Sequence, residues 1–144
     1  MGVLVETLET VTFWSNLRRV YDAVTEALTT SLGEGTLVLC HISHVYETGA
    51  SLYFTVATRQ ADDPVAQWLA AKAAACDAIV HSGASITHHH AVGQDHKPWL
   101  AEEIVMDAFA RTMSRWSKVE DADAPLAYVR RTVVNLCISR LRRL

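Results

Sequence analysis

The sequence predicts an α+β fold, in which an antiparallel sheet with packed helices is followed by an α-helical tail. Three observations support this: strand-like alternation near the N-terminus, two strand patterns joined by a short turn, and several stretches with helical spacing of apolar residues. The 144 residues are 50% hydrophobic and 20% charged. This composition is typical of a globular protein and excludes a disordered or collagen-like chain.

Three segments have strand patterns. Residues 3–13 alternate Val, Leu and Thr in part, which favours a strand. Residues 36–46 are rich in β-forming residues and too apolar for an exposed edge, which predicts a core strand. After a short turn, residues 51–58 return as an antiparallel partner, with Leu, Phe and Val on one face and Tyr53 on the other.

Helices are predicted where apolar residues recur at three- and four-residue spacing. Asp62-Asp63-Pro64 is a helix-start signature, because carboxylates stabilise the positive end of a helix and proline fits its first turn. The predicted helices cover residues 15–33, 62–81, a stretch from Pro98 through Phe109, and residues 125–144, which follow a loop of mostly acidic and small residues.

Charge is distributed unevenly along the chain. Residues 1–110 contain five Lys or Arg and 13 Asp or Glu, whereas residues 111–144 contain eight basic and three acidic residues. The basic part is therefore a candidate for binding an acidic partner. No apolar run reaches the roughly 18 residues of a membrane helix, and an acid comes too early for a secretory signal. We expect a cytoplasmic protein without a membrane span, whose three cysteines stay reduced.

Three consecutive histidines, His88, His89 and His90, lie in a polar loop. In an extended backbone two of them share one face, which makes a weak metal site at best, and no carboxylate or thiol at ligand spacing completes it. We therefore expect no metal site. The loop is either solvated without a role or has an acid–base or anion-contacting role, because imidazole titrates near neutrality.

The predicted hairpin carries three further polar rings. His41 and His44 are three residues apart on a strand, so we expect them on opposite faces, one buried and hydrogen-bonded and the other exposed. Tyr53 fits a core aromatic residue whose hydroxyl group is satisfied.

Four sequence blocks carry a resemblance over residues 3–104. They are residues 40–46 (CHISHVY), 48–54 (TGASLYF), 87–93 (THHHAVG) and 95–99 (DHKPW). Through these blocks the sequence resembles the C-terminal domain of FAD-linked oxidases of the alkyldihydroxyacetonephosphate synthase type. The triple-histidine block is the specific part of the match.

This resemblance implies an FAD-dependent exchange in which a long-chain fatty alcohol replaces the acyl group of acyl dihydroxyacetone phosphate, forming the ether bond of ether lipids. It implies that Tyr53 takes part in proton removal from the substrate carbon, and that His88, His89 and His90 line the pocket beside the flavin. His89 or His90 would make the acid–base or phosphate contact. A separate FAD-binding domain holds the cofactor in the family, and we expect residues 1–104 to be inactive without it.

The C-terminal part resembles a different family. Over residues 101–144 the sequence is similar to region two of extracytoplasmic-function sigma factors, through residues 101–111 (AEEIVMDAFAR), 130–136 (RRTVVNL) and 139–143 (SRLRR). That resemblance implies binding to RNA polymerase and to single-stranded promoter DNA in transcription initiation. The residues it places on phosphates are Arg130, Arg131, Arg140, Arg142 and Arg143.

Two domain-sized pieces are therefore predicted, residues 1–104 as an oxidase-like substrate domain and residues 105–144 as a sigma-like helical segment. The favoured function is a fragment of an FAD-dependent alkyl-transferring enzyme, because that resemblance covers more of the chain. The alternatives are a partial sigma factor module and a folded remnant without activity. From charge alone, the last helix also fits a solvated amphipathic helix whose arginines complement its negative C-terminal end.

Overall fold

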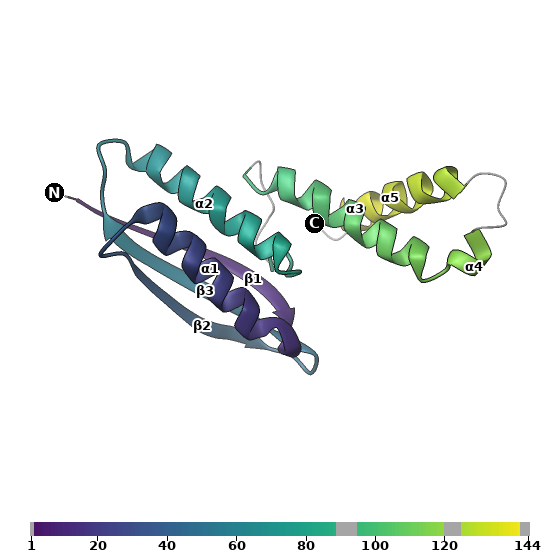
Figure 1. The fold of residues 1–144 in the computed structure, drawn as a ribbon, viewed down its shortest axis with the longest axis horizontal. Helices are drawn as coiled ribbons and strands as arrows, with labels where there is room; N and C mark the ends of the chain where they lie inside the picture. The colour runs from purple at the N-terminus through teal and green to yellow at the C-terminus, as the bar shows by residue number, and fades with distance from the viewer. Residues whose placement is uncertain (1, 89–94, 120–124, 142–144) are drawn as a thin grey trace. The chain divides into compact units, whose positions relative to one another are not determined.

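The computed structural model describes residues 2–88, 95–119 and 125–141 (Figure 1). Contacts within the chain divide it into two compact units, Met1–Val92 and Gly93–Leu144. This division falls earlier than the boundary after residue 104 that the sequence suggests. No helix among the described residues is long and apolar enough to cross a membrane.

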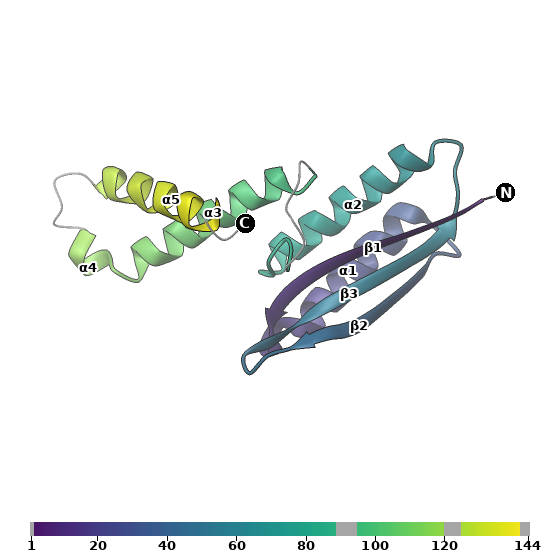
Figure 2. The ribbon, with the colours of Figure 1, turned by 180° about the vertical axis from the view of Figure 1, so that it is seen from behind.

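The first unit is a three-stranded antiparallel sheet with two helices. The strands are β1 (Val3–Phe13), β2 (Leu37–Val45) and β3 (Gly49–Arg59), in the order β1-β3-β2. Helix α1 (Leu17–Leu32) packs against the sheet, and helix α2 (Pro64–His81) packs against α1 and contacts β1. Figure 2 shows the sheet in front with α1 behind it. These elements confirm the predicted α+β class and the β2–β3 hairpin.

The alternation along β3 decides what each face of the sheet carries. Leu52, Phe54 and Val56 are buried, and the Phe54 ring stacks on Tyr21 of α1 with ring centres 6.3 Å apart. Tyr53 points to the other face, as the sequence predicts. The apolar stripe of α1 completes the core with Val20, Val24 and Leu28.

The sheet face opposite α1 is called the open face below. It carries apolar side chains at one end, where Val5, Leu37 and Leu39 are 59%, 53% and 55% exposed. The register aligns Val5 with Ala57 and Ala57 with Leu37, so these residues share one face. Within the described residues, one face of the sheet is therefore the core and the other is largely accessible.

The prediction that residues 36–46 form a core strand is wrong. β2 is an edge strand of the described sheet, and Leu37 and Leu39 are exposed on the open face. The apolar content of a strand reports its tendency to be buried, but it does not report its place in the strand order. β3 is the central strand, because β1 and β2 both pair with it.

The second unit consists of helices α3 (Lys97–Met113), α4 (Trp116–Val119) and α5 (Pro125–Leu141). α3 packs against α5, and Ile104, Ala108 and Thr112 of α3 are buried. The predicted helices at Pro98 and at residues 125–144 correspond to α3 and α5, of which α5 is described to Leu141.

Candidate functional site

A row of polar side chains crosses the open face of the sheet. Glu9 of β1 pairs with Tyr53 of β3, and Tyr53 pairs with His41 of β2. Side chains of directly opposed residues point to the same face. The His41 and Tyr53 rings lie 5.2 Å apart between centres, with a tilt of 36°. Tyr53, the predicted catalytic residue, is thus half-buried between a carboxylate and an imidazole rather than enclosed in the core.

A β-bulge in β2 adds a second histidine to this face. The register of β2 against β3 shifts between Ile42 and Val45. The shift places His44 with its Nδ1 atom 3.7 Å from Oε1 of Glu9. His41 and His44 therefore reach the same face and are both exposed, so the prediction of opposite faces is wrong. The physical reason is that a bulge interrupts the two-residue alternation.

Two serine hydroxyl groups connect the bulge to Glu9. Ser43 donates a hydrogen bond from Oγ to Oε1 of Glu9 at 2.7 Å, and its Oγ lies 2.6 Å from Oγ of Ser51. The backbone N–H of His44 donates to Oγ of Ser51 at 3.0 Å. Ser51 is fully buried in the central strand. These bonds hold the bulge in one conformation against β3.

The segment before the histidine loop is joined to the outer edge of β1. The N–H of Ser85 donates to the carbonyl of Val11 at 3.1 Å, and Thr10 donates from Oγ1 to the carbonyl of Ser85. Gly83 takes the left-handed φ of 75° that ends α2, a conformation that glycine adopts at little cost. Asn16 donates from Nδ2 to the carbonyl of Ser82 at 2.6 Å. The start of the histidine loop is therefore fixed beside Glu9.

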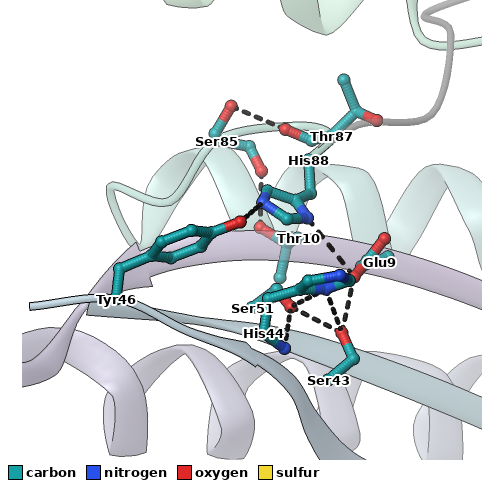
Figure 3. Close-up of polar contacts among 9 residues, drawn as sticks. All are labelled: Glu9, Thr10, Ser43, His44, Tyr46, Ser51, Ser85, Thr87 and His88. Carbon is teal, nitrogen blue, oxygen red and sulfur yellow. Dashed lines mark hydrogen bonds and ion pairs between the residues drawn. The ribbon is translucent and has the colours of Figure 1, made fainter.

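His88 is the histidine of the predicted triplet that the structure describes. Its Nε2 atom is 2.8 Å from the hydroxyl of Tyr46, and its Nδ1 atom is 3.5 Å from Oε1 of Glu9. The His88 side chain is 12% exposed, and its ring centre lies 5.1 Å from that of His44. Figure 3 shows His88 and His44 converging on Glu9 from two different elements. His89 and His90 lie outside the described residues.

Glu9 is the centre of this cluster, which we call the Glu9 cluster: Glu9, Ser43, His44, Tyr46, Ser51 and His88. The Glu9 side chain is only 2% exposed, and a buried carboxylate is costly unless charge or hydrogen bonds compensate it. Of the predicted site residues, Tyr53 and His88 are brought together here, because both neighbour Glu9.

Sequence reasoning missed Glu9, Tyr46 and Ser51. An acid between the apolar and small residues of a strand was a usable signal for Glu9, since such a residue is rarely buried without a partner. No local pattern indicates the bulge or the return of residue 88 to β1, because both depend on contacts between distant segments.

Cys40 lies next to this site on the opposite face of β2. It pairs with Phe54 across the hairpin, and burial raises the pKa of its thiol to about 11. The thiol is therefore protonated at neutral pH. Cys40, Cys76 and Cys137 are free cysteines, of which Cys76 is buried and the other two are half-buried.

The second unit holds a separate basic cavity of about 530 Å³ between α3 and α5. Three arginines line it: Arg111, Arg115 and Arg131, together with the Tyr128 side chain. Arg111 also forms an ion pair with Asp107 at 2.9 Å. Arg130 and Arg131 of the predicted phosphate-contacting set are exposed on α5. The side chain of Arg140, as well as Arg142 and Arg143, lie outside the described residues.

Comparison with known proteins gives one family. Residues 1–116 match the family of FAD linked oxidases, C-terminal domain. Alkyldihydroxyacetonephosphate synthase of Dictyostelium discoideum is 33% identical over 100 residues, which cover 67% of this chain and 16% of the relative. The synthase of Caenorhabditis elegans is 32% identical over 106 residues, covering 69% and 18%. The chain thus spans about a sixth of the length of these relatives.

A solved structure of alkyldihydroxyacetonephosphate synthase, crystallised in P212121, has 31% sequence identity and a TM-score of 0.49. The similarity covers 58% of this chain and 15% of that one.

Proposed function

Because the chain belongs to the FAD-linked oxidases through their C-terminal domain, we propose that it forms the substrate-side wall of a flavoenzyme of the alkyldihydroxyacetonephosphate synthase type. The proposed reaction replaces the acyl group of acyl dihydroxyacetone phosphate by a long-chain fatty alcohol. The observation that carries this proposal is the open face, on which Tyr53 stands between Glu9 and His41.

The side chains of the open face suit a flavin and an apolar substrate chain. Leu39 pairs with Thr55, and the next pair on this face of the hairpin is His41 with Tyr53. Apolar contact surface and hydrogen-bonding groups thus follow one another along the hairpin, as a planar cofactor with polar edges requires. Bound FAD would supply the electron-accepting chemistry of the exchange. A separate FAD-binding domain would hold most of the cofactor.

Proton transfer is the proposed role of the chain's own residues. The His41 imidazole would accept the hydroxyl proton of Tyr53 as the phenolic oxygen takes the proton that leaves the substrate carbon, since a neutral phenol is by itself a poor base. His89 and His90 are proposed to contact the substrate phosphate or transfer a proton. The predicted cofactor contact of His88 stays a prediction, because its ring nitrogens face Tyr46 and Glu9.

A domain-replacement experiment tests this function. The full chain is joined to the FAD-binding part of the Dictyostelium discoideum synthase in place of that enzyme's own C-terminal domain, and incorporation of labelled fatty alcohol is measured. We expect bound FAD, seen as a yellow protein, and measurable exchange. Tyr53→Phe should keep the bound FAD and lose exchange by about 100-fold or more.

Tyr128→Phe is the matched control, because it removes the same hydroxyl group from α5 in the other unit. It should change neither FAD content nor exchange. Unchanged exchange in Tyr53→Phe would contradict the proton-transfer role, and a folded chimera that binds FAD without any exchange would contradict the proposed reaction.

A second candidate function rests on the basic cavity between α3 and α5. Its arginines favour an anionic ligand, and residues 105–144 are the segment interpreted as sigma factor region two. The oxidase family match extends to residue 116 and so includes all of α3. Any binding of promoter DNA or RNA polymerase is therefore proposed mainly for residues of α5, which lies beyond the family match.

Single-stranded DNA binding at about 50 mM salt, where phosphate contacts are strong, tests this candidate. We expect Arg131→Gln to weaken binding and reduce the salt dependence, whereas Arg18→Gln on α1 removes an exposed arginine of the first unit and should leave binding unchanged. A chain that binds neither DNA nor RNA polymerase would exclude this function. If the chimera is inactive as well, the folded remnant is the remaining interpretation.

A further inference from the structure

We propose that Glu9, His44 and His88 bind one divalent transition-metal ion, for which Zn²⁺ is the probe. One ligand atom from each residue lies within 4.8 Å of the other two. The ligands come from β1, from the bulge of β2 and from the segment after α2, so an ion would connect three elements. Two imidazoles and one carboxylate form a ligand set that suits zinc and other first-row metals.

The spacing of the ligand atoms supports an ion between them. Ligands at about 2.0–2.2 Å from a tetrahedral zinc ion lie roughly 3.4 Å from one another. Nδ1 of His88 is 3.5 Å from Oε1 of Glu9, and Nδ1 of His44 is 3.7 Å from the same oxygen. Both distances exceed the range of about 2.7–3.2 Å for a direct N–H···O hydrogen bond. They are close to the separation of two ligands of one ion. Nδ1 of His44 also lies 3.2 Å from Oγ of Ser43, a contact that it would exchange for the ion.

The outer contacts of Glu9 and His88 have the arrangement seen around metal-binding residues. Nε2 of His88 lies 2.8 Å from the Tyr46 hydroxyl. When Nε2 donates its proton there, Nδ1 presents a lone pair toward Glu9 and is ready to bind a cation. Ser43 donates to Oε1 of Glu9 at 2.7 Å and so orients the carboxylate. A metal-binding histidine typically bonds such an outer partner through its second nitrogen.

Charge also favours a cation at this place. The Glu9 carboxylate is almost completely buried, and His88 is nearly so, so the negative charge sits where solvent screens it weakly. His44 is 46% exposed, which gives an ion a route from solvent. Three protein ligands leave one position of a tetrahedral ion open for water or another small ligand. The ion would hold the first histidine of the loop on the sheet.

Zinc titration of the full chain by calorimetry, after treatment with a chelator, tests the proposal without any flavin. We expect one Zn²⁺ per chain, and Co²⁺ in its place should give the visible absorption of a four-coordinate site. His44→Gln and Glu9→Gln should each weaken Zn²⁺ binding by more than about 100-fold, and Tyr46→Phe by about 10–100-fold.

Two controls separate this site from the other histidines. His81→Gln changes an exposed histidine whose Nδ1 contacts the Asp77 carbonyl, and it should leave binding unchanged. A His89→Gln/His90→Gln double variant should also keep the site. His44→Gln changes an exposed side chain, so this variant should remain folded, which circular dichroism will show. The proposal is overturned if the folded chain binds no Zn²⁺, or if the folded His44→Gln and Glu9→Gln variants bind it as the unchanged chain does.

Discussion

Removing the same side chain from the two faces of the sheet tests the premise that one face is open. Leu52 of β3 is 2% exposed on the helix-covered face, whereas Leu39 of β2 is 55% exposed on the open face. Leu52→Ala leaves a cavity in the core and should lower the free energy of unfolding by about 2–5 kcal/mol. Leu39→Ala removes a side chain that is already mostly in water and should cost less than about 1 kcal/mol.

These free energies predict clearly different melting temperatures. A domain of this size loses about 4–8 °C for each kcal/mol, so Leu52→Ala should melt on the order of 10–30 °C lower, whereas Leu39→Ala should shift by only a few degrees. Urea unfolding of the full chain, followed by circular dichroism, gives the free energies directly. Equal costs at the two positions would refute the reasoning, because they would mean that the open face is covered and is not available to a cofactor or substrate.

Three more predictions concern single positions. Burial raises the pKa of the Cys40 thiol from an ordinary 9.0 to about 11, so between these pH values the folded chain keeps a proton that the unfolded chain has lost. The contribution of this thiol to the free energy of unfolding should therefore be fully present below about pH 9 and fall as the pH rises toward 11, which urea midpoints will show. Asn16→Ala removes the bonds to the Ser82 carbonyl and to Oγ1 of Thr12, and should cost about 1–3 kcal/mol by denaturant unfolding. Gly49→Ala would place a Cβ 2.1 Å from the Thr12 carbonyl oxygen, and should destabilise the first unit by about 1–3 kcal/mol or more in thermal melting.

Each of these has a distinct contrary outcome. Cys40→Ser should remove much of the alkaline loss of stability, and an unchanged pH profile in that variant would assign the loss to another group. An Asn16→Ala chain as stable as the original would mean that water replaces both bonds. A Gly49→Ala chain with an unchanged melting temperature would show that the β1 and β3 backbones separate there without cost.

Much of the fold followed from local patterns. The period of two along residues 51–58 correctly placed Tyr53 opposite Leu52 and Phe54, because alternation along a regular strand is a backbone property. Asp62-Asp63-Pro64 correctly marked the start of α2, where Asp63 accepts a hydrogen bond from the N–H of Ala66 at 3.0 Å. Such signals act within one turn or one strand and need no knowledge of the rest of the chain.

The errors have a common cause in contacts between distant segments. The two-residue alternation predicts opposite faces for His41 and His44, but a bulge turns His44 to the open face on which His41 already lies. The apolar pattern of residues 36–46 indicated a core strand, yet β2 is an edge strand of the described sheet. Strand order and bulges depend on which partner a strand finds, and that choice is made by the packing of the entire unit.

By itself, the sequence determined the α+β class, the hairpin, the helix starts and the family, because propensity, periodicity and motif spacing are written in neighbouring residues. It also identified Tyr53 and His88 as candidate site residues. Only the tertiary structure decided that Glu9 lies between them and that His44 joins His88 at its carboxylate. His44 and His88 are 35 and 79 positions from Glu9 along the chain. Only the pairing of β1 and β2 with β3 and the return of residue 88 to β1 bring the three within ligand distance.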